Sequence, residues 1–151
     1  ADFMNEADVD FVITHPHGYE LDPKFVRHAQ VEYDQDKALE GADFVYAKNW
    51  SPFKADIYGQ VVNKKMSWTV TSQKMALTNN AFFMHCLPAF HDLETTTMQA
   101  LHAKSGLTEL EVTDEIFNAS NSVVFQEAEN RLHSIKAVMA ATLGHLYIPK
   151  V

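Results

Sequence analysis

Four short apolar runs, separated by segments of helical character, constrain the fold of this chain more than any other feature of its sequence. The runs cover residues 10–14, 43–47, 81–85 and 122–125, and a weaker strand is expected at residues 30–33. Runs of this length with few polar breaks are typical of strands buried on both faces. Because strands alternate with helical segments, the sequence predicts a doubly wound α/β fold with a mainly parallel sheet and helices on both faces.

The segments between and after these runs predict helices at residues 22–29, 36–40, 72–78, 92–103, 113–117 and 126–146. Gly41, Gly106 and Gly144 stand where three of these helices would end. A length of 151 residues suits one domain with its own core, so residues 1–151 are expected to form a single unit. Residues 49–68 are the one long irregular stretch, and loops of that length are usually functional or mobile.

Composition and charge exclude several classes of protein. The net charge of -8 at pH 7 and the single basic doublet, Lys64-Lys65, argue against binding to nucleic acid. No apolar run approaches the roughly 20 residues that span a bilayer, so no membrane role is expected. The first residues show no basic segment followed by an apolar core, as a signal peptide would. Cys86 is the only cysteine, so no internal disulfide is possible, which is typical of a cytoplasmic protein.

The polar residues that follow the four runs indicate where a site would lie. In open parallel sheets, ligands bind beyond the carboxyl ends of the strands. The residues at these ends are His15 to Gly18, Lys48 to Trp50, His85 to Pro88, and the group Glu127, Glu129, Asn130 and Arg131. Neither His15-Pro16-His17 nor His85-Cys86 has further ligands at metal-binding spacing, so we expect no metal and no cofactor.

Residue types alone leave the roles of these side chains open. Cys86 is either a small buried hydrophobe or a polar group at a strand end. Pro88 allows a cis peptide bond after Leu87, which would turn the backbone and direct the Leu87 carbonyl into the cleft. Arg131 either contacts an anion near a helix N-terminus or pairs with Glu127 on the helix surface. Lys48 and Trp50 are, on spacing alone, a solvated charge and a core aromatic.

Two motifs together carry a family resemblance. His85-Cys86-Leu87-Pro88, followed by residues 128–133 with the sequence AENRLH, resembles the second, amino-acid-binding domain of the ornithine-type carbamoyltransferases. The resemblance covers essentially the whole chain. Residues 11–88 are similar to N-succinylornithine and N-acetylornithine carbamoyltransferases, and residues 89–151 are similar to the catabolic ornithine carbamoyltransferases. It implies a Rossmann-like domain that lacks its first strand.

The resemblance also implies a reaction and the residues that perform it. Carbamoyl phosphate would donate its carbamoyl group to the δ-amine of ornithine or an N-acylornithine. Cys86 and the Leu87 carbonyl would hold and help to deprotonate the δ-ammonium, while Arg131 contacts the carbamoyl oxygen. The implied catalytic residues are Cys86, Arg131 and His85, and the implied substrate-binding residues are Lys48, Asn49, Trp50, Leu87 and Pro88.

The chain departs from the family pattern at both ends of the acceptor site. Lys48 stands where the ornithine enzymes place the aspartate that holds the α-ammonium, and a lysine there suits an N-acylornithine. Phe90-His91 stands where the acyl-ornithine enzymes carry two arginines, so the acceptor stays open between ornithine, N-acetylornithine and N-succinylornithine.

The motifs of the family's first, carbamoyl-phosphate-binding domain are missing from this chain: Ser-x-Arg-Thr-Arg and His-Pro-x-Gln. The chain is therefore expected to be inactive alone, and a non-catalytic amino-acid-binding module or an inactive fragment of the same fold are the alternatives. The resemblance also implies a homo-oligomer for the complete enzyme, since family members are commonly trimers formed through the first domain.

Overall fold

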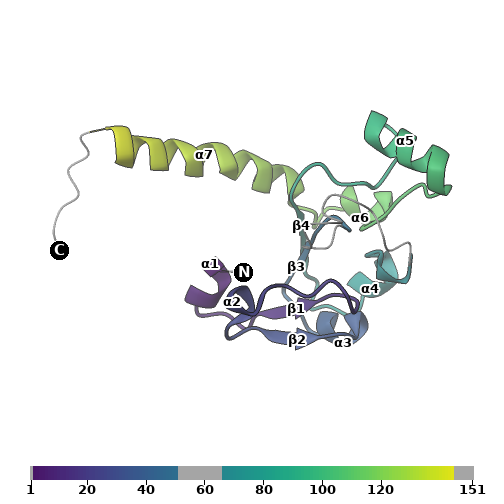
Figure 1. The fold of residues 1–151 in the computed structure, drawn as a ribbon, viewed down its shortest axis with the longest axis horizontal. Helices are drawn as coiled ribbons and strands as arrows, with labels where there is room; N and C mark the ends of the chain where they lie inside the picture. The colour runs from purple at the N-terminus through teal and green to yellow at the C-terminus, as the bar shows by residue number, and fades with distance from the viewer. Residues whose placement is uncertain (1, 51–65, 145–151) are drawn as a thin grey trace.

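The computed structural model describes residues 2–50 and 66–144, which form short strands and helices in alternation (Figure 1). The elements before residue 51 are α1 (Asp2–Glu6), β1 (Val12–Thr14), α2 (Pro23–Val26), β2 (Gln30–Glu32), α3 (Gln35–Leu39) and β3 (Phe44–Ala47). Those after residue 65 are η1 (Met66–Trp68), α4 (Ser72–Met75), β4 (Phe82–His85), α5 (Thr96–Ser105), α6 (Asp114–Phe117) and α7 (Val124–Leu143). Of the irregular stretch 49–68, residues 51–65 lie outside the described part.

The strands pair in parallel, as the alternation with helices predicts. β1 pairs with β2 in the register Val12 to Gln30, and β3 pairs with β4 in the register Phe44 to Phe82. Within the described residues these are two separate pairs instead of one continuous ladder. A parallel bridge between Phe83 and Ser122 extends the β3–β4 pair by one residue. The parallel α/β architecture is thus confirmed.

The prediction of a strand at residues 122–125 is wrong. Only Ser122 forms a bridge, and α7 begins two residues later at Val124. Val124 is buried, whereas the Phe125 side chain is 63% exposed, as expected for a helix that packs through one face only. A four-residue apolar run cannot by itself distinguish a strand from the first turn of a helix.

The core lies on one face of the β3–β4 pair. Val45 and Phe83 point into it and are covered by buried residues of α3, α4 and α6, among them Leu39, Met75 and Phe117. Successive side chains of a strand point to opposite faces, so the other face carries Phe44, Tyr46 and Phe82, which are all exposed. Burial of these strands on both faces, as the sequence predicts, is therefore not found in the described residues.

Capping residues explain where the helices begin and end. The Asp34 carboxylate accepts from the Asp36 amide at 3.1 Å, and the Thr95 hydroxyl accepts from the Met98 amide at 3.2 Å, so both cap the helices that follow. Gly106 closes α5 with a φ of 74°, a left-handed conformation that glycine adopts without a steric penalty. The expected ends at Gly106 and Gly144 are confirmed.

The longest helix, α7, extends away from the rest of the molecule after its first turns (Figure 1). Every residue from Ala128 to Gly144 is exposed, including the large apolar side chains of Leu132, Ile135, Val138, Met139 and Leu143. Among the described residues, no helix combines the length and the apolar character needed to cross a bilayer. The apolar side chains of α7 thus form an exposed stripe.

Candidate functional site

The loop after β4 carries the sequence that is most specific to the predicted site. β4 ends at His85, and the next residue, Cys86, is exposed with a free thiol. The peptide bond between Leu87 and Pro88 is cis, as the sequence allows. Cys86, Leu87 and Pro88 are all exposed, so the loop presents its thiol and its backbone to the surface at the carboxyl end of the β3–β4 pair.

A buried carboxylate holds this loop from beneath. Glu111 is 1% exposed and His85 is fully buried. Their Oε1 and Nε2 atoms lie 3.1 Å apart. Glu111 Oε1 also accepts from the Phe90 amide at 2.9 Å, while His85 Nδ1 lies 2.6 Å from the Cys86 carbonyl. A carbonyl oxygen only accepts, so Nδ1 is the donor in that bond.

Asn49 connects the end of β3 to the same loop. Its Nδ2 donates to the Pro88 carbonyl and to Glu111 Oε1, in both cases at 3.2 Å. Of its two neighbours in the chain, Lys48 is exposed and Trp50 is half-buried. The structure therefore brings together predicted residues from two strand ends: Asn49, His85, Cys86, Leu87 and Pro88.

The first turn of α7 contributes a second carboxylate to this region. Glu127 Oε1 accepts from the Tyr46 hydroxyl at 2.6 Å, and its Oε2 accepts from the His85 amide at 3.1 Å. Burial, followed by the neighbouring Glu127 carboxylate and the Cys86 thiol, raises the pKa of Tyr46. Glu127 thus bonds to β3 and β4 instead of forming the surface pair with Arg131 that its spacing allows.

The other predicted strand-end residues lie elsewhere. Arg131 is about two turns into α7, and its side chain is exposed. His15 and His17 follow β1 and pack around Tyr33, which follows β2: the His17 ring stacks on Tyr33 at 4.2 Å, and the His15 ring meets it edge-on at 5.3 Å. These two histidines therefore belong to the β1–β2 pair and not to the Cys86 loop.

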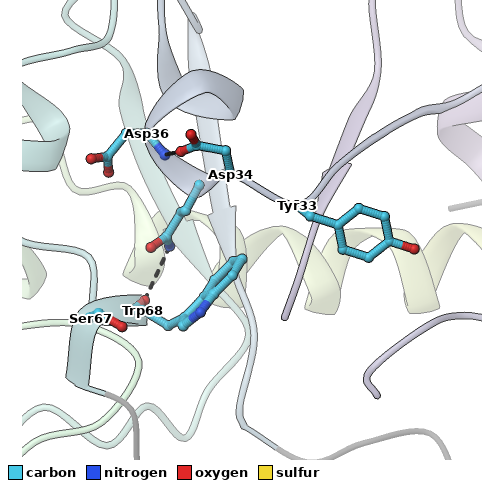
Figure 2. Close-up of a pocket in the computed structure, with 6 residues that line it drawn as sticks. Tyr33, Asp34, Asp36, Ser67 and Trp68 are labelled. Carbon is cyan, nitrogen blue, oxygen red and sulfur yellow. Dashed lines mark hydrogen bonds between the residues drawn. The ribbon is translucent and has the colours of Figure 1, made fainter. Parts of the chain in front are cut away.

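An open polar recess with a volume of about 400 Å³ lies beside the start of α3 (Figure 2). It is lined by Tyr33, Asp34, Gln35, Asp36, Ser67 and Trp68. Asp34 is engaged in capping α3, and Gln35 Nε2 donates to the Trp68 carbonyl at 3.1 Å. None of the lining residues is one that the sequence predicts for the site, and two of them join α3 to η1.

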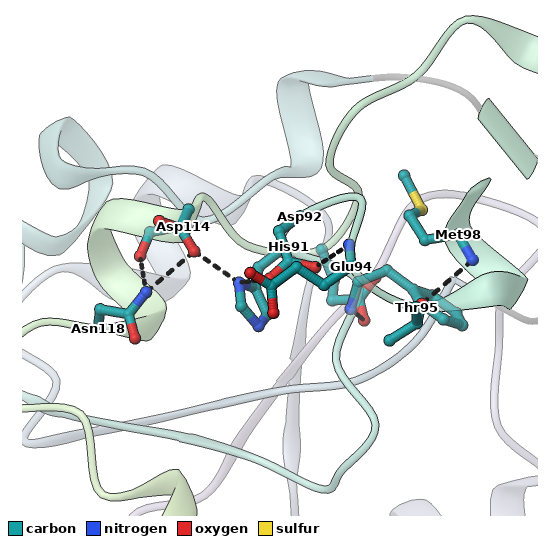
Figure 3. Close-up of polar contacts among 9 residues, drawn as sticks. His91, Asp92, Glu94, Thr95, Met98, Asp114 and Asn118 are labelled. Atoms are coloured by element: carbon teal, nitrogen blue, oxygen red, sulfur yellow. Dashed lines mark hydrogen bonds and ion pairs between the residues drawn. The ribbon is translucent and has the colours of Figure 1, made fainter.

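His91, Asp92 and Asp114 form the one group in the described ranges whose donor atoms are close enough to share a metal ion (Figure 3). His91 Nδ1 lies 2.8 Å from Asp114 Oδ1 and 3.5 Å from Asp92 Oδ2, and the imidazole stacks on Phe117 at 3.6 Å. Asn118 also donates to Asp114, at 2.9 Å. The imidazole is thus already paired with a carboxylate, and we assign no metal to this group.

Sequence reasoning missed two residues of the site, Tyr46 and Glu111. Tyr46 lies within an apolar run and looks like an ordinary strand residue. Glu111 carried a signal, because it is a charged residue between two apolar ones, Leu110 and Val112, and all three are buried. Acidic residues are almost never fully buried unless they are paired.

Comparisons with known proteins agree on one family. The model of the aspartate/ornithine carbamoyltransferase family, for its Asp/Orn binding domain, matches residues 1–142. The N-succinylornithine carbamoyltransferase of Bacteroides fragilis is 47% identical over 146 residues, which cover 97% of this chain and 41% of that protein. The catabolic ornithine carbamoyltransferase of Lactococcus lactis subsp. lactis is 44% identical over 121 residues, which cover 77% of this chain and 34% of that protein.

The solved structures agree with the sequence comparison. Acetylornithine transcarbamylase complexed with acetylcitrulline matches with a TM-score of 0.65 at 32% identity, over 87% of this chain and 39% of that one. This chain spans well under half the length of the relatives that it matches. The resemblance based on residues 85–88 and 128–133 is confirmed: the chain belongs to the aspartate/ornithine carbamoyltransferase family and corresponds to its Asp/Orn-binding domain.

Proposed function

We propose that residues 1–151 form the acceptor-binding domain of a carbamoyltransferase that uses carbamoyl phosphate and ornithine or an N-acylornithine. The observation that carries this proposal is the convergence of Asn49 and the Cys86–Pro88 loop at one sheet edge, held by Glu111 from beneath. Relatives named for both kinds of acceptor support the substrate class.

In the proposed reaction, the neutral δ-amine attacks the carbonyl carbon of carbamoyl phosphate. A C–N bond forms, the C–O bond to phosphate breaks with its electron pair leaving on phosphate, and the amine nitrogen passes a proton to the departing phosphate. Cys86 and the Leu87 carbonyl accept hydrogen bonds from the N–H groups of the δ-amine and orient it, and Arg131 stabilises the charge that develops on the carbamoyl oxygen. His85 is buried, so it braces the loop from within.

Lys48, Asn49 and Trp50 are assigned to the other end of the acceptor. Lys48 is exposed beside the loop, and its positive charge would attract a carboxylate and repel a free α-ammonium. N-acylation removes the charge of the α-amine, so we propose an N-acylornithine as the preferred acceptor. Pro88 contributes its carbonyl, which fixes Asn49.

The test measures product formation from carbamoyl phosphate with ornithine, N-acetylornithine and N-succinylornithine in turn. It uses this chain alone and then the chain joined to a family first domain. We expect no product from the chain alone, and product from the joined form with one acceptor preferred. Binding of an acceptor without turnover in the joined, folded form would instead identify a non-catalytic binding module.

Two substitutions sharpen this test. Cys86→Ala in the joined form is expected to lower kcat strongly, because orientation of the amine is lost. Lys48→Ala should lower kcat/KM for an N-acylornithine about ten- to a hundredfold, since a charged hydrogen bond contributes about 1.5–3 kcal/mol. Lys37→Ala, which changes another exposed lysine on α3, is the matched control and should leave kcat/KM unchanged.

A further inference from the structure

The exposed apolar side chains of α7 have the spacing of a coiled-coil seam. Ala128, Leu132, Ile135 and Met139 follow one another at intervals of four, three and four residues. This alternation places them in one stripe along a helix, and two such stripes pack against each other as knobs into holes. All four residues are exposed, and the Leu132 and Met139 side chains remain 66% and 54% exposed. The stripe is therefore suited to bind a second helix along its length.

Charged side chains lie on both sides of this stripe. Glu129 follows Ala128 and Lys136 follows Ile135, so both lie along one side of the stripe, whereas Arg131 precedes Leu132 and lies along the other. The three charged side chains are exposed, and none forms an ion pair with another described residue. Charges in these positions select the partner helix and its direction in a coiled coil.

We propose that α7 is a dimerisation helix, which pairs antiparallel with α7 of a second copy of this chain. In this pair, Leu132 packs opposite Ile135 of the second copy, and Ala128 packs opposite Met139 of the second copy. The two-fold symmetry of a homodimer repeats both contacts. The small Ala128 side chain faces the long, unbranched Met139 side chain, so the layers alternate small and large residues.

The charges favour this antiparallel direction over a parallel one. In the antiparallel pair, Glu129 lies between the same two layers as Lys136 of the second copy, and symmetry makes two such attractive pairs. A parallel pair would instead place Arg131 beside Lys136 of the second copy, which is a repulsion between like charges. The occupant that complements this stripe in charge is therefore a second α7 that runs in the opposite direction.

The rest of the molecule is compatible with such a pair. Glu127 bonds to the Tyr46 hydroxyl and to the His85 amide, so the β3–β4 pair lies at the N-terminal end of α7 (Figure 1). In an antiparallel dimer the two β3–β4 pairs lie at opposite ends, whereas a parallel dimer brings them to the same end. Residues 128–143 offer a seam of about 24 Å. Helices in proteins owe most of their stability to packing of an apolar face, and the second copy supplies that packing.

The test measures the mass of the full chain by sedimentation velocity up to about 100 μM, with an expected dissociation constant of about 10 μM. We expect a species with twice the 17.1 kDa mass of one chain. Ile135→Glu places a charge in the seam and should leave the chain monomeric over this range. Ser134→Glu adds the same charge at an exposed position outside the seam and should change the dissociation constant less than about threefold. Far-UV circular dichroism confirms that each variant is folded.

Charge reversal tests the direction of the pair. Glu129→Lys and Lys136→Glu should each weaken the homodimer about tenfold, because each makes both attractive pairs repulsive. An equimolar mixture of the two variants should form a heterodimer about as tightly as the wild type, since opposite charges then face each other again. In a parallel pair, Lys136→Glu would instead tighten the dimer, because it faces Arg131.

Three results would overturn the proposal. They are a wild-type chain that is monomeric at about 100 μM, equal dissociation constants for the Ile135 and Ser134 variants, and a tighter dimer for Lys136→Glu. The assay needs no carbamoyl transfer, so its failure is separate from failure of the proposed function.

Discussion

Replacing Glu111 by alanine should unfold this domain more readily than any other single change near the loop. Its carboxylate is the acceptor for the Phe90 amide and for Asn49, and its Oε1 atom lies 3.1 Å from Nε2 of the buried His85. Without this carboxylate the Phe90 amide and Asn49 lose an acceptor, so the expected loss is about 2–6 kcal/mol, at about 1–3 kcal/mol for each unsatisfied group. The stranded Phe90 amide alone accounts for about 1–3 kcal/mol of that range.

Glu111→Gln separates the charge from the hydrogen bonds. Glutamine keeps an acceptor oxygen for the Phe90 amide but loses the negative charge facing His85. Hydrogen bonds to charged groups contribute about 1.5–3 kcal/mol and neutral ones about 0.5–1.5 kcal/mol, so this variant should be destabilised by about 1–2 kcal/mol. Glu109→Ala, two residues away and outside the network, is the control and should change the free energy of unfolding by less than about 0.5 kcal/mol.

The measurement is urea-induced unfolding followed by circular dichroism and tryptophan fluorescence, with the free energy extrapolated to water. The free energy of unfolding should decrease in the order wild type, Glu111→Gln, Glu111→Ala. A double-mutant cycle with His85→Ala should show that the two changes together are less destabilising than their sum. A loss below about 1 kcal/mol for Glu111→Ala would refute the reasoning, because the three contacts would then have found replacements.

Three further predictions follow from other parts of the structure. Because folding raises the pKa of Tyr46, the folded state binds the phenolic proton more tightly than the unfolded state does. The free energy of unfolding is therefore retained below pH 10, the ordinary pKa of tyrosine, and falls as the pH rises above it. Tyr46→Phe should make the urea midpoint of unfolding less dependent on pH between pH 8 and pH 11. Thr95→Ala removes the cap that accepts from the Met98 amide and should lower the free energy of unfolding by about 1 kcal/mol in the same titration. Leu132→Glu with Met139→Glu, both at exposed positions on α7, should leave that free energy within about 0.5 kcal/mol and reduce self-association in light scattering.

The sequence was most informative about elements whose signals are local. The runs that became β1, β3 and β4 were predicted correctly, because each is a short apolar stretch bounded by polar residues. Residues 122–125 failed, because Val124 and Phe125 have the same composition as a strand and only tertiary packing makes them the start of α7. Parallel topology also predicted that Asn49 and the Cys86 loop would share a sheet edge.

The rest of the site depends on contacts between residues far apart in the chain. Glu111 reaches His85 across 26 positions, and Glu127 reaches Tyr46 across 81. No periodic pattern encodes which strand face a distant carboxylate will meet, so neither pairing was predicted. Arg131 shows the same limit. Its place along the last helix could be predicted from the sequence, but the direction in which α7 leaves the sheet could not.

α7 works mechanically as a lever. Its 20 residues extend over about 30 Å, and the hydrogen bonds of a helix make that length behave as one rod. The root of the rod holds Glu127 in place against Tyr46, while its far turns stand in solvent. A partner that binds the far end of α7 would therefore fix the orientation of the helix, and a small rotation there would change the direction of the Glu127 carboxylate.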